Sequence, residues 1–220
     1  MENDISLVGG LALASLLPFI IACGTCYIKF SVVFVMVRNA IGLQQIPSNL
    51  TLNSIALILA AFVMMPFIRE GLQVYHAIPE GERTVQSVVR QMDEGLSGYR
   101  EYLIRYADPA LTSWFDKAQR GHEDKGEGDE SDEAGVPSLS ALLPAYALTE
   151  IKDAFRIGFY LYLPFVVVDL LISSVLLALG MMMMSPVTIS LPIKLLLFIV
   201  MDGWTLLSKG LIEQYITISG

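Results

Sequence analysis

Long apolar runs alternate with polar stretches along the chain, and the clearest runs lie toward the C-terminal end. Ile157–Leu179 and Val187–Leu207 are each about long enough to cross a hydrocarbon core of roughly 30 Å as a helix. The link between them, Gly180–Pro186, is so short that the two runs must return on each other. The pattern therefore predicts a tight antiparallel helical hairpin.

Four consecutive methionines, Met181, Met182, Met183 and Met184, occupy the tip of this predicted hairpin. Links between spans are normally polar, whereas methionine is apolar and adapts to irregular surroundings through three rotatable bonds. Two interpretations remain open. Copies of the tip line a pore as a deformable seal, or the tip packs against neighbouring helices or lipid.

Three ionisable residues interrupt the hairpin: Asp169 in the first run, and Lys194 and Asp202 in the second. Ionisable groups at membrane depth are costly and usually face protein interior or water, often in pairs. Folding the hairpin about Met183 brings Asp169 and Lys194 to within about one helical turn of the same depth. We therefore predict an ion pair between them, and we prefer a structural role for it over a proton relay.

Two further apolar runs, Ile5–Gly24 and Leu50–Ile68, lie in the N-terminal part of the chain. Each approaches the length of a span, and we expect Pro66 to end the second. The first run is not typical of a cleaved signal peptide, because Glu2 and Asp4 stand where positive charges are expected. We expect it to be retained.

Residues 25–49, between these two runs, carry Lys29 and Arg38 but no acidic side chain. Their apolar side chains recur at helical spacing, which predicts an amphipathic or buried helix that ends at the polar turn 44–49. The recurring residues are Phe30, Phe34, Val37 and Ile41. We treat Lys29 and Arg38, together with Asp169, Lys194 and Asp202, as candidate assembly residues of the apolar regions.

A long hydrophilic region, residues 69–156, separates the N-terminal region 1–68 from the C-terminal hairpin region 157–220. Its apolar residues recur at helical spacing around Val85–Met92 and Tyr99–Tyr106, and Asp108 followed by Pro109 is a helix start. The region therefore predicts a small lobe of three short helices. Residues 121–136 have almost no apolar side chain to bury, so we expect them to form a mobile acidic loop.

Composition and charge place the chain among integral membrane proteins. The chain has 220 residues, of which 54% are hydrophobic, and its mean hydropathy is +0.59. Residues 69–133 carry 15 acidic and 8 basic side chains, which accounts for −7 of the net charge of −8. Such an acidic lobe argues against a nucleic-acid partner. With the lobe outside the cell membrane, Lys29 and Arg38 fall inside, as the positive-inside rule favours.

Little in the sequence suggests catalysis. Cys23 and Cys26 have CxxC spacing, but they lie in an apolar run without a nearby histidine or second pair, so we interpret them as core residues rather than zinc ligands. The chain has no G-x-x-x-x-G-K-[ST] phosphate loop and no clustered metal ligands. We expect no enzymatic activity and no cofactor.

Two blocks of the sequence are long and distinctive: KFSVVFVMVRNAIGLQQIPSNLTLNSIAL, Lys29–Leu57, and Leu142–Leu207, which includes DLLISSVLLALGMMMMSPVTISLP. Both blocks resemble the SctR/FliP family, the core subunits of the export gate in bacterial type III secretion systems and flagella. Together they cover 95 of 220 residues. The hydrophilic lobe matches poorly, and the uncleaved start is similar to the virulence-injectisome branch.

The resemblance implies an all-α protein of broken, tilted helices that assembles into a ring of five copies. It implies SctS-, SctT- and SctU-type partner subunits, contact with membrane lipid, and a channel that passes unfolded protein substrates across the bacterial inner membrane. It further implies an assembly that protrudes into the periplasm. In such a family the methionine-rich loop, here Met181–Met184, acts as a gasket that closes the channel.

Two other functions remain as alternatives. A proton-coupled small-solute transporter would use Asp169 and Lys194 as coupling residues and would be expected to show an internal repeat. We find no convincing repeat between the two halves of the chain. A passive membrane scaffold would bind a partner through the acidic lobe.

Overall fold

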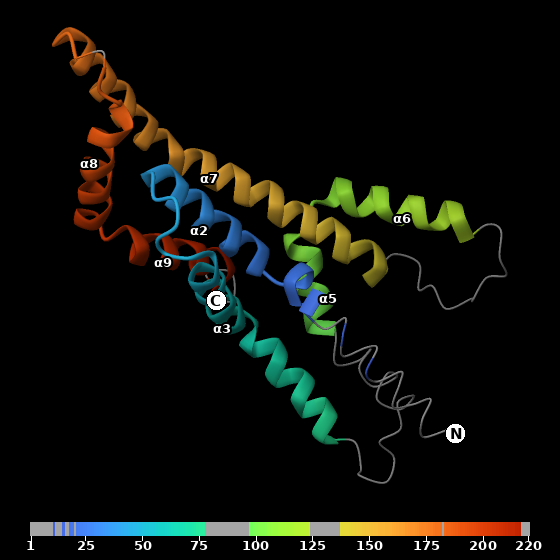
Figure 1. The fold of residues 1–220 in the computed structure, drawn as a ribbon. Helices are drawn as coiled ribbons and strands as arrows, with labels where there is room; N and C mark the ends of the chain where they lie inside the picture. The colour runs from blue at the N-terminus through green and yellow to red at the C-terminus, as the bar shows by residue number, and fades with distance from the viewer. Residues whose placement is uncertain are drawn as a thin grey trace. The chain divides into compact units, whose positions relative to one another are not determined.

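The computed structural model describes residues 11, 15, 18, 19, 21–77, 97–123, 137–181 and 183–216. Every regular element within these residues is an α-helix, which confirms the predicted all-α class (Figure 1). The helices are α2 (Tyr27–Ile41), α3 (Asn49–Ala77), α5 (Ser97–Tyr106), α6 (Pro109–Glu123), α7 (Leu139–Ala178), α8 (Pro186–Val200) and α9 (Gly203–Ile216).

The chain divides into two compact units. Unit 1 comprises Met1–Cys26 and Met64–Glu150, and unit 2 comprises Tyr27–Val63 and Ile151–Gly220. Helices α3 and α7 each contribute residues to both units. Two limits of the regions expected from the sequence, 68/69 and 156/157, fall inside these continuous helices, and the three-region division stays a prediction.

Helix α2 forms the core of unit 2. The four apolar residues whose spacing predicted it are all buried, and Phe30 and Phe34 pack edge-on against Tyr215 and Trp204 of α9, with ring centroids 5.9 and 6.1 Å apart. The helix ends where Gly42 adopts φ +98°, a conformation that favours glycine. The predicted buried helix with its polar end is therefore confirmed.

Helix α3 starts where the sequence predicts but extends further. The hydroxyl of Ser48 accepts a hydrogen bond from the amide of Thr51 at 3.2 Å and so caps the helix. The expectation that Pro66 ends the helix is wrong, because α3 continues through it to Ala77. Proline removes one helical hydrogen bond, but the apolar neighbours offer the remaining backbone groups no partner better than the helix itself.

Two helices are long and apolar enough to cross a membrane: Asn49–Gln73 within α3, and α7. The pair α8 and α9 passes the same test as one broken span with a bend of 58°. Most of the predicted apolar run Ile5–Gly24 lies outside the described residues. Within the described part of the chain, the structure therefore supports two spans, or three if the bent pair counts as one.

The C-terminal hairpin differs from the prediction in its second arm, which is not the single segment Val187–Leu207. Helix α8 stops at Val200, and α9 begins at Gly203. Asp202 between them has φ +49°, a left-handed conformation that aspartate tolerates better than most residues. The Asp202–Gly203 pair is thus the physical cause of the break, in line with the turn preference of these two residues.

Unit 1 contains α5, α6 and the first part of α7. Asp108 accepts a hydrogen bond from the amide of Ala110 at 3.0 Å, which confirms the predicted start of α6. The hydroxyls of Tyr102 and Tyr146 form a buried hydrogen bond of 2.6 Å. The hydroxyl of Tyr99 donates to the carbonyl oxygen of Gly24 at 2.7 Å, and burial raises the pKa of Tyr99 to about 12.

Two other expectations for the hydrophilic region fall wholly or largely on residues that the structure does not describe. The predicted helix around Val85–Met92 lies outside the described residues. Helix α6 continues through residues 121–123, the start of the expected acidic loop, and residues 124–136 lie outside the described part of the chain.

Candidate functional site

The methionine tip joins α7 to α8 through a turn that depends on Gly180 (Figure 1). Gly180 has φ +75°, and the amide of Met181 donates to the carbonyl oxygen of Leu176 at 2.9 Å. This bond and the left-handed glycine together form a Schellman motif, which ends α7. Pro186 then begins α8, because its fixed φ suits the first position of a helix.

The methionine side chains of the tip that the structure describes are exposed. Met183 is fully exposed, at 102%, and Met181 and Met184 are exposed at 39% and 44%. Met182 lies outside the described residues. Three polarisable, flexible thioethers are therefore available at the end of the hairpin to contact another molecule.

Asp169 and Lys194 form the ion pair predicted from the sequence. The Lys194 ammonium lies 2.5 Å from Asp169 Oδ2 and donates a second hydrogen bond, of 3.3 Å, to the carbonyl oxygen of Ala40. Lys194 is buried, whereas the Asp169 side chain is about one-third exposed, at 34%. Ala40 is in the last turn of α2, where carbonyl groups lack helical partners and attract cations. Lys194 therefore joins α7, α8 and the C-terminal end of α2.

Lys29 is buried near the other end of α2. Its ammonium lies 3.8 Å from Asp153 Oδ2 on α7 and 4.9 Å from the centre of the Tyr215 ring on α9. Sequence reasoning missed both partners, because it assigned Asp153 to the hydrophilic region. The sequence did offer a signal: Lys152, Asp153 and Arg156 are charged residues directly before an apolar run, where a partner for a buried lysine can lie.

The remaining charged candidates, Arg38 and Asp202, take no part in these two ion pairs. Arg38 is buried and its Nη1 donates to the carbonyl oxygen of Pro47 at 3.0 Å, while its Nε is buried without a hydrogen-bond partner among the described residues. Asp202 is exposed at the break between α8 and α9. The structure thus brings Asp169 and Lys194 together, and it gives Lys29 and Arg38 separate partners.

The site offers packing surfaces and fixed charges rather than a reactive centre. Cys23 is exposed and Cys26 is buried, and the two are not joined by a disulfide. Across the described residues no three histidine, cysteine, aspartate or glutamate side chains are grouped to hold a metal ion. The arrangement is therefore suited to positioning an exposed apolar tip by means of partly buried ion pairs.

Comparisons with known proteins identify the family of the chain. The sequence profile of the FliP family matches residues 11–211. The surface presentation of antigens protein SpaP of Salmonella typhi is 61% identical over 223 residues, with 100% of both chains covered. The Yop proteins translocation protein R of Yersinia pestis is 44% identical with 98% of each chain covered, and the harpin secretion protein HrcR of Erwinia amylovora is 36% identical with 92% of each covered. The chain therefore belongs to the FliP family, the SctR/FliP family that its sequence resembles.

Proposed function

We propose that this chain is a pore-forming core subunit of a type III secretion export gate. In this role, several copies, five by the family resemblance, enclose a channel through which unfolded protein substrates cross the bacterial inner membrane. The similarity, over 92–100% of each chain, to proteins named for antigen presentation, Yop translocation and harpin secretion supports the proposal. SctS-, SctT- and SctU-type subunits complete the gate.

The methionine tip is the gasket of this channel. The observation that carries this part of the proposal is the exposure of Met181, Met183 and Met184 at the end of a hairpin whose arms are joined by a partly buried ion pair. Apolar thioethers from several copies exclude water and ions when they meet on a common axis. Because methionine side chains have many rotamers, they also part around an extended polypeptide without demanding a particular sequence.

The Asp169–Lys194 pair holds the hairpin against α2 so that the tip keeps its position. This structural role fits a lysine that donates both to a carboxylate and to a carbonyl group at a helix end. A transporter that used the same pair for proton coupling would have to break both bonds in each cycle.

Disulfide crosslinking in membranes tests the proposal. In a Cys23→Ala background, which removes the exposed native thiol, Met183→Cys is expected to yield disulfide-linked dimers of the chain under mild oxidation, because tips from neighbouring copies meet. Met201→Cys, at the other end of α8 and 57% exposed, is the matched control and is expected to remain monomeric. Equal crosslinking of the two variants, or none at Met183→Cys, would contradict the proposed convergence of the tips.

A further inference from the structure

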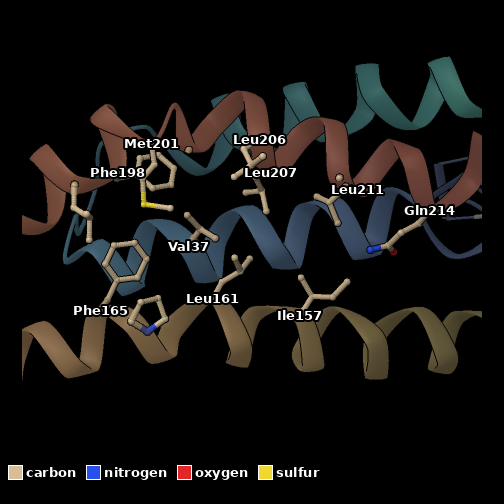
Figure 2. A pocket seen from close by; sticks show the side chains of 14 residues that line it. Val37, Ile157, Leu161, Phe165, Phe198, Met201, Leu206, Leu207, Leu211 and Gln214 are labelled. Carbon is tan, nitrogen blue, oxygen red and sulfur yellow. The ribbon is translucent and has the colours of Figure 1, made fainter.

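Unit 2 contains an apolar pocket of about 320 Å³ between α2, α7, α8 and α9 (Figure 2). Val37 and Leu161 line its middle, Phe165 lies toward one end, and Ile157 and Gln214 lie toward the other (Figure 2). Thirteen of its fourteen lining residues are apolar, and Gln214 is the exception. The pocket therefore favours an occupant that is hydrocarbon over most of its length.

The apolar lining of the pocket restricts its occupants. Water is unsuited, because a buried water needs polar partners, and apolar cavities of about half this volume stay dry and bind small hydrocarbons. From Ile157 to Phe165 the pocket follows α7 for about 12 Å, at 1.5 Å per residue. A thin, extended hydrocarbon chain fits these limits.

The membrane supplies such a chain. Helix α7 and the bent pair α8–α9, which form three of the four walls, are candidate membrane-spanning segments. Acyl chains of phospholipids surround helices of this kind, so they are the apolar molecules present at the highest concentration. The pocket also borders the 58° bend between α8 and α9, where two straight helices cannot close the space between them.

Positive charge lies near the Gln214 end of the pocket. Arg156 directly precedes Ile157 on α7, Lys209 lies two residues before Leu211 on α9, and one acidic residue, Glu213, directly precedes Gln214. Both cations are exposed, and neither forms an ion pair with any residue that the structure describes. Basic side chains beside an interhelical pocket are typical of sites that hold lipid phosphates.

We propose that unit 2 binds one membrane phospholipid, with an acyl chain in this pocket and the phosphate group beside Arg156 and Lys209. The bound chain fills space that the four helices leave between them, and the phosphate adds a partner for the two cations. This site is separate from the methionine tip, and its test does not depend on secretion.

A substitution that fills the pocket provides the test. Gly210 lines the pocket, and an added Cβ there meets no atom within 4 Å, so Gly210→Leu is chosen to place a side chain in the acyl-chain space. Gly71 on α3 has the same open surroundings and lies outside the pocket, which makes Gly71→Leu the matched control. The purified assembly is equilibrated with phosphatidylglycerol, freed of excess lipid and measured by native mass spectrometry.

Wild type and Gly71→Leu are expected to retain one phosphatidylglycerol per copy of the chain, and Gly210→Leu at least about tenfold less. An Arg156→Gln and Lys209→Gln double variant is expected to retain less lipid than wild type while the pocket stays open. Retention by Gly210→Leu that equals retention by Gly71→Leu would overturn the proposal. So would a wild-type assembly that retains no phospholipid, a result that needs no variant to fold.

Tryptophan fluorescence gives a second, independent measurement. The chain has two tryptophans, and Trp114→Phe leaves Trp204, whose ring lies 5.2 Å from that of the pocket residue Phe198. Phosphatidylglycerol with brominated acyl chains is expected to quench Trp204, and the quenching should persist after excess lipid is removed. It should be lost when Gly210→Leu is added. Trp204 fluorescence that is unaffected by retained brominated lipid would place the acyl chain elsewhere and contradict the site.

Discussion

Lys194 on α8 bonds both to Asp169 on α7, at 2.5 Å, and to the carbonyl oxygen of Ala40 at the end of α2, at 3.3 Å. One buried ammonium therefore connects three helices of unit 2 that are distant in the sequence. The carboxylate balances its charge, and the carbonyl group belongs to a helix end that lacks helical donors. This bonding defines how the base of the methionine hairpin is held.

Removal of the ammonium is expected to destabilise unit 2. Lys194→Met leaves the Asp169 carboxylate without its cation and the Ala40 carbonyl without this donor. Breaking a fully buried pair in this way costs about 3–5 kcal/mol. We expect a smaller loss of unfolding free energy, about 1–3 kcal/mol, because one-third of the Asp169 side chain reaches solvent. Chemical denaturation of the purified protein in detergent measures the change.

Two further variants show whether a loss of stability in Lys194→Met comes from the broken ion pair. Lys117→Met, at an exposed lysine of α6, controls for loss of a positive charge and is expected to change stability by less than about 0.5 kcal/mol. Asp169→Leu combined with Lys194→Met removes both charges and is expected to recover part of the loss. A Lys194→Met protein as stable as wild type would show that the pair does not hold the hairpin.

Two glycines of α9 are expected to respond oppositely to the same substitution. A Cβ at Gly203 would overlap the ring of Phe198, so Gly203→Ala forces the ring or the start of α9 to move. Overpacking of this kind costs about 1–3 kcal/mol. At Gly210 the space is open, and Gly210→Ala is expected to stabilise the helix by about 0.5–1 kcal/mol. Thermal unfolding of both variants checks the contrast, and a Gly203→Ala protein that gains stability contradicts the packing at the bend.

Alkaline pH is expected to destabilise unit 1 through its buried tyrosines. Burial raises the pKa of Tyr99 to about 12 in the folded protein, whereas an unfolded tyrosine has a pKa of about 10. Between these values the unfolded state releases a proton that the folded state keeps, so stability is intact below about pH 10 and falls as pH rises through about 12. Burial also raises the pKa of Tyr102 and Tyr106.

Tyr99→Phe separates the titration of this residue from the others. The variant loses the hydrogen bond to Gly24 at all pH values, but its stability should fall less steeply between about pH 10 and 12, by up to about 2 kcal/mol over that interval. Chemical denaturation at several pH values measures the slope. A slope equal to that of wild type would mean that Tyr99 does not retain its proton in the folded state.

The hairpin and its ion pair were predictable because they depend on local signals. Gly180 and Pro186 mark the turn, and the distances of Asp169 and Lys194 from the tip match closely enough to set them side by side. The buried face of α2 likewise follows from the spacing of Phe30, Phe34, Val37 and Ile41, since helical periodicity places them on one side.

Other features were not predictable, because tertiary context decides them. Pro66 is a strong local stop signal, yet α3 continues through it to Ala77, because proline removes only one helical hydrogen bond and the flanking residues still favour the helix. The break at Asp202 is different, because the Asp202–Gly203 pair is a local turn signal, but the hydropathy pattern stays apolar on both sides and so predicts one continuous run. The pairing of Lys29 with Asp153 joins residues 124 positions apart, and only the packing of α2 against α7 brings them together.

The central claim is that Met181–Met184 from several copies seal a channel, and ion leak through the assembled gate tests it most directly. The measurement compares membrane conductance in cells that carry wild-type protein, a Met182→Ala and Met183→Ala double variant, or the control Met201→Ala, which replaces an exposed methionine at the far end of α8. The account predicts that the double variant leaks small ions while secretion largely persists, because shorter side chains leave a gap on the axis without blocking the path, and that Met201→Ala stays tight. Conductance of the double variant equal to that of wild type, in gates that still assemble and secrete, would contradict the gasket.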